Sequence, residues 1–238
     1  MNKKNIIVIG ASAGGIDALK RLFSGISKAI DASIFIVWHM PSDLTGVLPR
    51  VLGKVTPMTV ANAIDNEPIT SGRVYVAPPD RHLMIESGRV RVVRGPKENR
   101  FRPAVDPLFR SAAYAYGSRV IGIILSGSLD DGAAGLWAIK RFGGTAIVQD
   151  PQEAEVPGMP ESALRLVREL DYKITVREMA AVLSKLVLQP AAENHEPGNR
   201  QREQTHSELK VAMMEEQIGK KPMGELTPYT CVMVCYQP

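Results

Sequence analysis

The residues with the clearest chemical potential are a serine, a histidine and a pair of aspartates, each found after an apolar stretch of the chain. Ser12 lies in a glycine-rich loop after the first stretch, His39 follows the second, and Asp130 and Asp131 follow the third. A serine hydroxyl attacks carbonyl carbons when a histidine takes its proton and a carboxylate holds the imidazole in the right tautomer. These residue types therefore predict acyl transfer or hydrolysis, with Asp130 and Asp131 equally suited to the third role.

The loop around Ser12 has the sequence Gly-Ala-Ser-Ala-Gly-Gly over residues 10–15. Small neighbours leave room for a nucleophile on a tight turn, and a helix that starts near Gly15 directs free amides and its positive dipole end toward the loop. Such amides can stabilise the oxyanion of acyl transfer. The segment also matches the nucleophile-elbow pattern, but the chain order Ser, His, Asp differs from that of α/β-hydrolases, so we expect a different fold.

Other interpretations of these residues stay open at this point. A glycine-rich turn after a first strand is commonly a phosphate or dinucleotide loop, although the glycine spacing here does not fit Gly-x-Gly-x-x-Gly and no acidic residue closes the second strand. His39 can be a structural histidine, and either aspartate can cap the helix that follows. His82, which opens a hairpin after two prolines, is a rival for the histidine role.

The elements that must position these residues alternate along the chain. Apolar and β-branched runs predict strands, which we place at 5–9, 33–38, 73–77, 82–86, 89–93, 120–126, 145–148 and 172–175. Helical spacing of apolar residues predicts helices, which we place at 16–30, 44–52, 107–116, 133–141, 161–169, 176–188 and 207–218. The alternation predicts an α/β fold with a doubly wound, mainly parallel sheet. Ser87-Gly88 between two of the strands predicts an antiparallel hairpin as an excursion from that sheet. In such folds ligands bind at the carboxyl ends of the strands, where Ser12 and His39 are expected.

Composition and charge exclude several classes of protein. Of 238 residues, 45% are hydrophobic and 23% charged, which is ordinary globular usage and not that of a disordered or collagenous chain. Aromatic residues make up 5% and no dense Lys/Arg run occurs, so we expect no nucleic-acid partner. The apolar run near the N-terminus is too short for a signal peptide or a membrane span. We therefore expect a cytoplasmic protein without membrane insertion; nothing in the sequence indicates its oligomeric state.

The chain divides into two parts. Residues 1–189 carry a net charge of +6 and hold the alternating elements, while residues 190–238 carry −2 and begin with a Pro- and Gly-containing stretch over 189–204. We expect a catalytic domain at 1–189, followed by a polar linker and an acidic, partly helical tail at 190–238. Cys231 and Cys235 both lie in the tail, and with only His195 or His206 as further ligands they favour free thiols over a four-ligand zinc site.

Six blocks of the sequence, in this order, resemble the catalytic domain of the CheB-type protein-glutamate methylesterases of bacterial chemotaxis. The blocks are IIVIGASAGGIDAL, FIVWHMPSDLT, GRVYVAPPDRHL, FRPAVDPLF, IGIILSGSLDDGAAGLWAIK and AIVQDPQEAEVPGMPESAL, and together they cover about residues 4–188. The resemblance implies hydrolysis of glutamate γ-methyl esters on the cytoplasmic helices of methyl-accepting chemoreceptors, with deamidation of some receptor glutamines. It implies no metal or organic cofactor.

The resemblance also implies roles for particular residues. It makes Ser12 the nucleophile and His39 the general base, and it selects Asp131 over Asp130 because the family's aspartate stands directly before the Gly-Ala-Ala block. The amides near Ala13 and Ser128 would then hold the oxyanion. Arg102 and Asp106, within the block FRPAVDPLF, either shape the substrate cleft or serve packing and capping at a helix start.

Three features depart from the family pattern. Ala13 replaces a frequent threonine, and Leu129 replaces a glycine next to the site, which puts loop shape and substrate access in question. The first strand begins near residue 5, which leaves no room for the N-terminal receiver domain of the usual family member, so we expect constitutive activity or control in trans. A receptor-binding module without turnover, and an esterase for another substrate, are the alternatives to the methylesterase.

Overall fold

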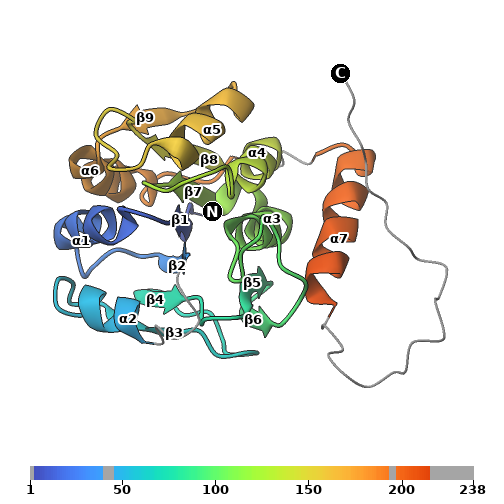
Figure 1. Ribbon diagram of the computed structural model, residues 1–238, viewed down its shortest axis with the longest axis horizontal. Helices are drawn as coiled ribbons and strands as arrows, with labels where there is room; N and C mark the ends of the chain where they lie inside the picture. The colour runs from blue at the N-terminus through green and yellow to red at the C-terminus, as the bar shows by residue number, and fades with distance from the viewer. Residues whose placement is uncertain (1–2, 40–45, 193–196, 215–238) are drawn as a thin grey trace.

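A seven-stranded, fully parallel sheet forms the centre of the protein, which a computed structural model describes over residues 3–39, 46–192 and 197–214 (Figure 1). The strand order is β3-β4-β2-β1-β7-β8-β9. The strands span Ile6–Ala11 (β1), Ser33–Trp38 (β2), Thr59–Asn62 (β3), Arg73–Val76 (β4), Val120–Ile124 (β7), Thr145–Gln149 (β8) and Tyr172–Ile174 (β9). The predicted doubly wound α/β architecture is confirmed.

The central strands are continuous apolar runs because both faces of the sheet are covered. In β1 the side chains of Ile7 and Ile9 join the core on one face, whereas Ile6 and Val8 join the core on the other. All four are buried to 2% exposure or less, and the strand carries no polar side chain. β1 therefore fixes the middle of the sheet, with β2 and β7 as its two neighbours.

Helices cover the sheet on both faces (Figure 1). One face carries α1 (Gly15–Gly25), α2 (Val47–Leu52) and α6 (Val176–Leu186), whose apolar side chains share a core with Ile7 and Ile9. The other carries α3 (Val105–Tyr116), α4 (Ala133–Arg141) and α5 (Gly158–Leu166), with a single 3₁₀ turn at Gly117–Arg119 between α3 and β7. Because helices cover both faces of the sheet, a site has room at the ends of the strands.

The predicted hairpin is present with the predicted bounds. Strands β5 (His82–Glu86) and β6 (Arg89–Val93) pair antiparallel as a separate two-stranded sheet. Gly88 adopts a left-handed φ of 78° in the turn between them. The hairpin packs on α3 through Leu83 and Ile85, so the chain entering α3 lies close to the hairpin.

Some predicted helix ends are shifted: α1 ends at Gly25, where residue 30 was predicted, and α5 lies three residues earlier than the predicted 161–169. Two elements differ more from the prediction. The edge strand β3 was not predicted, because none of its four residues is fully buried and the segment shows no clear periodicity. The last helix, α7 (Asn199–Met213), begins inside the predicted linker, whereas its predicted start was at residue 207. Only Thr205, Leu209 and Ala212 of α7 are buried, a stripe too narrow to stand out in a polar sequence. Residues 215–238, with Cys231 and Cys235, lie outside the described residues.

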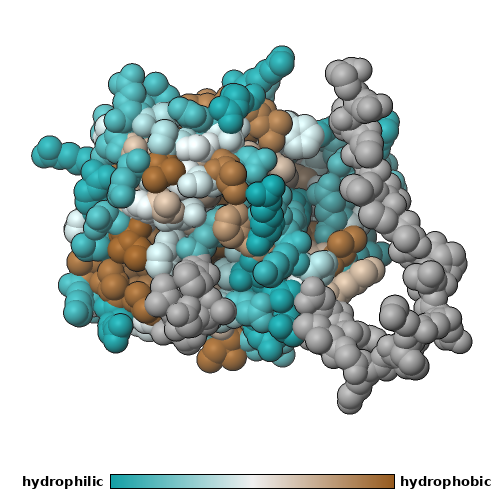
Figure 2. All heavy atoms as spheres, in the orientation of Figure 1, coloured by the Kyte–Doolittle hydropathy of each residue, from teal (hydrophilic) through white to brown (hydrophobic). Residues whose placement is uncertain are grey.

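Hydrophilic residues cover most of the face shown in Figure 2, and apolar residues gather mainly over the side of α1 and α2. Within the part of the chain that the structure describes, no helix has the length and apolar character needed to cross a membrane.

Candidate active site

Ser12 is the first residue after β1, at the carboxyl edge of the sheet. Its N–H donates to the Ser126 carbonyl oxygen at 2.9 Å, and its own carbonyl oxygen accepts from the Gly15 N–H at 2.9 Å and from Trp38 Nε1 at 3.0 Å. Gly14 has a φ of 71°, a left-handed conformation that turns the chain abruptly into α1. The Ser12 backbone is therefore held from three sides, next to the point where strand order reverses between β1 and β7.

His39 is the first residue after β2, beside Ser12. Its N–H donates to the Ala11 carbonyl oxygen at 3.0 Å, and its Nε2 donates to Asp131 Oδ2 at 2.7 Å. The side chain is only 4% exposed, and its ring stacks on Phe101 with centroids 3.7 Å apart. Within the described residues the buried Nδ1 has no hydrogen-bond partner. Nδ1 is therefore the ring nitrogen available to accept a hydroxyl proton.

Asp131 is buried to 1% exposure and fully hydrogen-bonded. Besides His39, the Val105 N–H donates to Oδ2 at 2.7 Å, while the Asp106 N–H and Asn99 Nδ2 donate to Oδ1 at 3.2 and 2.8 Å. Burial alone would raise the pKa of Asp131, but the hydrogen bond and charge of His39, with the hydrogen bonds from Val105 and Asn99, outweigh it and lower that pKa. The carboxylate is thus kept ionised next to the imidazole.

The two neighbouring aspartates have different surroundings. Asp131 points to His39, whereas Asp130 is exposed and its backbone carbonyl accepts from the Ala133 N–H at 3.1 Å, at the start of α4. Within the described part of the chain, Asp131 is the aspartate that contacts His39.

Two residues outside the predicted set contact His39 and Asp131. Asn99 Nδ2 donates to Asp131 Oδ1 and, at 2.8 Å, to Asp106 Oδ2; Phe101 lies flat against the His39 ring. Both sit in one tight turn between β6 and α3. The sequence signal for them is weak, because a turn between a strand and a helix is common and nothing in its residues indicates which side chains point inward.

Asp106 lies behind Asp131 and does not line the site cavity. It is 3% exposed, and its Oδ1 accepts from the Gly135 N–H at 2.6 Å. Burial, and then the negative charge of Asp131, raise the pKa of Asp106 to about 7. Of the two roles expected for Asp106, support at the helix start fits these contacts.

The raised pKa of Asp106 predicts a pH dependence of stability. Its native pKa of about 7 exceeds the pKa of 3.8 that is usual for an aspartate, so between these pH values the native state binds more protons than the unfolded state. The free energy of unfolding should therefore fall as pH rises through this window. Asp106→Asn should flatten the slope, which urea unfolding at several pH values measures. An unchanged slope in the variant would contradict the assignment.

Backbone amides next to Ser12 are available for a developing oxyanion. Within the described residues, the N–H groups of Ala13 and Ser128 donate to no acceptor, and Ala13 lines the cavity beside Ser12. Ser126 Oγ donates to the Ala13 carbonyl oxygen at 2.8 Å and fixes the peptide that follows. A Cβ on Gly127 would lie 2.7 Å from Ser12 Cβ, so only glycine allows the Ser128 loop to approach this closely.

A cavity of about 620 Å³ opens above Ser12 and His39. Ile16, Trp38 and Phe101 form apolar parts of its wall, and the exposed carboxylates of Asp17 and Glu155 stand at its edge. Ser12 Oγ has no hydrogen-bond partner within the described residues and is therefore free to meet a ligand there. The hydrogen bond between a catalytic serine and its histidine is often long or poorly aligned before substrate binds.

Leu129, next to Ser128, has a left-handed φ of 69° and is 49% exposed. A left-handed conformation costs an L-residue about 1–2 kcal/mol, whereas glycine loses about 0.5–1 kcal/mol of chain entropy. Leu129→Gly should therefore raise the free energy of unfolding by about 0.5–1 kcal/mol in urea titrations. Leu129→Ala keeps the Cβ and should show no gain; equal stabilisation by both would contradict the strain argument.

The remaining candidates lie away from the cavity. Arg102 Nε donates to Asp80 Oδ1 at 2.8 Å and its Nη1 to the Gly95 carbonyl oxygen at 2.7 Å, so it anchors the loop before α3. His82 is fully buried and bonds Pro96 and Ala104, which makes it a structural histidine.

The potential metal ligands considered in the sequence are His195, His206, Cys231 and Cys235. No cluster of three potential metal ligands exists within the described residues. His206 stacks on Tyr114, with centroids 5.6 Å apart, whereas His195, Cys231 and Cys235 lie outside the described residues.

Comparisons with known proteins agree on one family. The profile of the CheB methylesterase family matches residues 7–183. A putative protein-glutamate methylesterase/protein-glutamine glutaminase of Leptospira interrogans is 40% identical over 181 residues, which are 76% of this chain and 93% of that protein. An enzyme of the same type from Xanthomonas oryzae is 40% identical over 166 residues, but the match covers only 47% of its length. The crystal structure of the Thermotoga maritima CheB methylesterase catalytic domain superposes with a TM-score of 0.74 at 36% identity, covering 79% of this chain and 100% of that one.

Proposed function

Because this chain belongs to the CheB methylesterase family, we propose that it hydrolyses glutamate γ-methyl esters on the cytoplasmic helices of methyl-accepting chemoreceptors and releases methanol. The observation that carries the proposal is the buried hydrogen bond of 2.7 Å between His39 Nε2 and Asp131 Oδ2, together with the cavity that both His39 and Ser12 line. A carboxylate, an imidazole and a serine in this relation are the parts of an acyl-transfer triad. We assign the activity to residues 1–189 and a cytoplasmic location to the protein.

The acylation step uses the free nitrogen of His39. Ser12 Oγ attacks the ester carbonyl carbon while its proton passes to His39 Nδ1, and Asp131 stabilises the imidazolium that forms. The amides of Ala13 and Ser128 hold the negative oxygen of the tetrahedral intermediate. The intermediate collapses when the bond to the methoxy oxygen breaks, and His39 gives its proton to the leaving methanol.

Deacylation repeats the sequence with water. His39 Nδ1 takes a proton from a water molecule, the hydroxide attacks the glutamyl ester of Ser12, and the bond to Ser12 Oγ breaks with return of the proton. The product is a receptor glutamate. The same steps on a receptor glutamine release ammonia in place of methanol, which accounts for deamidation. Neither reaction uses a metal or an organic cofactor in any of these steps.

The charge distribution supports an acidic partner. Residues 1–189 carry a net charge of +6, which favours the approach of a receptor helix rich in glutamate. The carboxylates of Asp17 and Glu155 at the cavity edge favour a neutral ester or amide over the charged glutamate product. The partner is therefore drawn in by the surface as a whole, while the site itself disfavours retention of the product.

The test is release of methanol by the purified full-length chain from receptor cytoplasmic fragments that carry radiolabelled methyl esters. We expect volatile label to appear with time, in proportion to enzyme. Binding of the fragments without release would favour a receptor-binding module, and release from simple esters but never from receptor fragments would favour another substrate. Either outcome would overturn the proposal.

A further inference from the structure

Helix α7 lies outside the residues matched by the family profile, yet it packs on the catalytic domain. The match ends at residue 183, and α7 begins at Asn199. Leu209 and Ala212 of α7 form a small core with Met84 and Val93 of the hairpin. In Figure 1 α7 stands beside α3 and the β5–β6 hairpin, on the side away from the rest of the fold.

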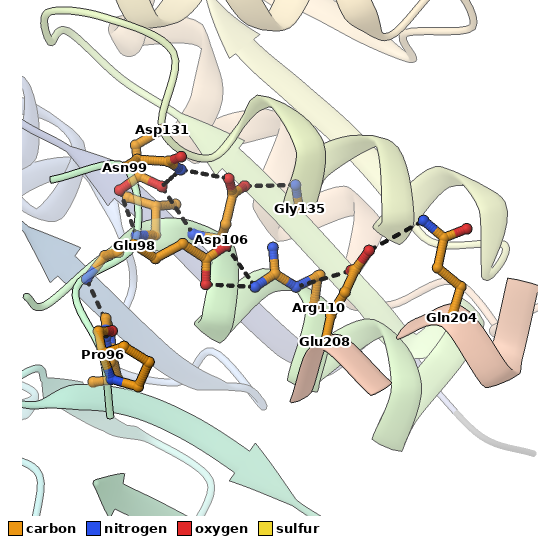
Figure 3. A network of polar contacts seen from close by, with 12 residues as sticks. Pro96, Glu98, Asn99, Asp106, Arg110, Asp131, Gly135, Gln204 and Glu208 are labelled. Carbon is orange, nitrogen blue, oxygen red and sulfur yellow. Dashed lines mark hydrogen bonds and ion pairs between the residues drawn. The ribbon is translucent and has the colours of Figure 1, made fainter. Parts of the chain in front are cut away.

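An ion-pair chain runs inward from α7 (Figure 3). Glu208 Oε2 lies 3.3 Å from Arg110 Nε, and Arg110 Nη2 donates to Glu98 Oε2 at 2.7 Å. The Arg110 side chain is 8% exposed, so its guanidinium group is held between α3 and α7. Arg110 therefore ties Glu98 to a helix that the family profile does not include.

Glu98 opens the turn that carries the two residues in contact with the candidate triad. The Glu98 N–H donates to the Phe101 carbonyl oxygen at 3.1 Å, and the Phe101 N–H donates back at 2.8 Å. Between them Asn99 and Arg100 have φ values of 50° and 72°, left-handed conformations that two successive non-glycine residues adopt only when their surroundings enforce them. From this turn Asn99 reaches Asp131, and Phe101 stacks on His39.

A second contact from α7 meets the chain just before the turn. A Cβ on Gly95 would overlap the carbonyl oxygen of Ala212, so the end of α7 lies directly against this residue. The Gly95 carbonyl oxygen also accepts from Arg102 Nη1 at 2.7 Å. Segment 95–102, which we call the support loop, is thus held by α7 at Gly95 and, through Arg110, at Glu98.

We propose that α7 is a positioning element for the active site, with Glu208 as the positioning residue that, through Arg110, holds the support loop against His39 and Asp131. The expected effect of α7 on turnover rests on the proposed function. The geometry does not depend on the proposed function, because the contact between Phe101 and His39 exists whatever the reaction. Misplacement of supporting groups by about 1 Å can lower turnover as much as 10²-fold.

The test uses Glu208→Ala in the full chain, with Glu203→Ala as the matched control. Glu203 is an exposed glutamate of α7 whose side chain makes no hydrogen bond or ion pair within the described residues. Since Glu208 is 40% exposed in its pair, we expect a moderate effect: kcat about fivefold lower, with KM nearly unchanged. The control should keep the wild-type kcat.

An activity-independent signature is the proton resonance of the His39 ring, which the stacked Phe101 ring shifts. We expect this resonance to move in Glu208→Ala and to stay in Glu203→Ala. Glu208→Gln, which keeps the side-chain size and one acceptor oxygen, should move it in the same direction by less, and it serves if the alanine variant unfolds. Equal kcat and equal resonances in the Glu208 and Glu203 variants would overturn the inference. If the wild-type chain releases no methanol, the proposed function fails while the resonance still tests α7.

Discussion

Ser12→Ala should abolish methanol release, with kcat reduced about 10⁴-fold or more. The alanine side chain cannot form the acyl-enzyme, so water would have to attack the ester directly with only the Ala13 and Ser128 amides to assist. Removal of one hydroxyl should leave the fold intact, because Ser12 is held through its backbone by Ser126, Gly15 and Trp38. Initial rates on labelled receptor fragments measure the loss.

The control for this variant is Ser24→Ala, the same change in α1, where the hydroxyl donates to the Arg21 carbonyl oxygen at 2.8 Å. Ser24→Ala should keep the wild-type rate. Binding of receptor fragments should survive in Ser12→Ala, since the cavity wall of Ile16, Trp38 and Phe101 is unchanged. If Ser12→Ala releases methanol at the wild-type rate, Ser12 is not the nucleophile.

The sequence was sufficient for six of the seven strands of the sheet, all but β3, and for placing Ser12 and His39 side by side. Ser12 and His39 each follow an apolar run, which is typical of a buried strand. Parallel strands bring their carboxyl ends to the same side of the sheet. β1 and β2 pair in register up to Ala11 and Trp38, so the next residues are neighbours by geometry. The hairpin was equally clear, because Ser87-Gly88 fixes both its turn and its register.

The sequence was not sufficient for the surroundings of the carboxylate. Composition cannot separate Asp130 from Asp131, because which of them turns inward depends on the conformation of the loop after β7, where Leu129 takes a left-handed φ of 69°. The contacts from Asn99 and Phe101 depend on a turn stabilised by residues far away in the chain. Arg110 and Glu208, which hold that turn, are separated by 98 positions, so no local pattern indicates their pairing.

The extent of helix α7 was also beyond what the sequence could predict. Helix α7 buries only Thr205, Leu209 and Ala212, and an isolated helix with so narrow an apolar stripe is marginal. Its extent is explained by the partners it meets: the hairpin residues Met84 and Val93, and the ring of Tyr114 under Arg202 at 5.1 Å. These are tertiary contacts, which local propensity does not contain.

Asp131→Asn should lower kcat about 10⁴-fold, whereas Asp130→Asn should keep a rate near that of the wild type. The reason lies in the donors around Asp131. Both of its oxygens accept from a backbone N–H, Oδ2 from Val105 and Oδ1 from Asp106. Whichever way an asparagine side chain turns, its NH₂ group faces a donor, at a cost of about 1–3 kcal/mol for the unsatisfied buried group.

Of the two orientations of the asparagine side chain, one leaves fewer hydrogen-bond donors unpaired. With NH₂ in place of Oδ1, it would face both Asn99 Nδ2 and the Asp106 N–H; in place of Oδ2, it would face the Val105 N–H and could donate to His39 Nε2. The second orientation is therefore favoured, and it places the imidazole proton on Nδ1, the nitrogen that must accept from Ser12. Asp131→Asn should thus combine a destabilisation of about 1–3 kcal/mol in urea unfolding with a loss of kcat far larger than unfolding explains. Full activity in Asp131→Asn together with loss in Asp130→Asn would show that the neighbouring carboxylate serves His39 instead.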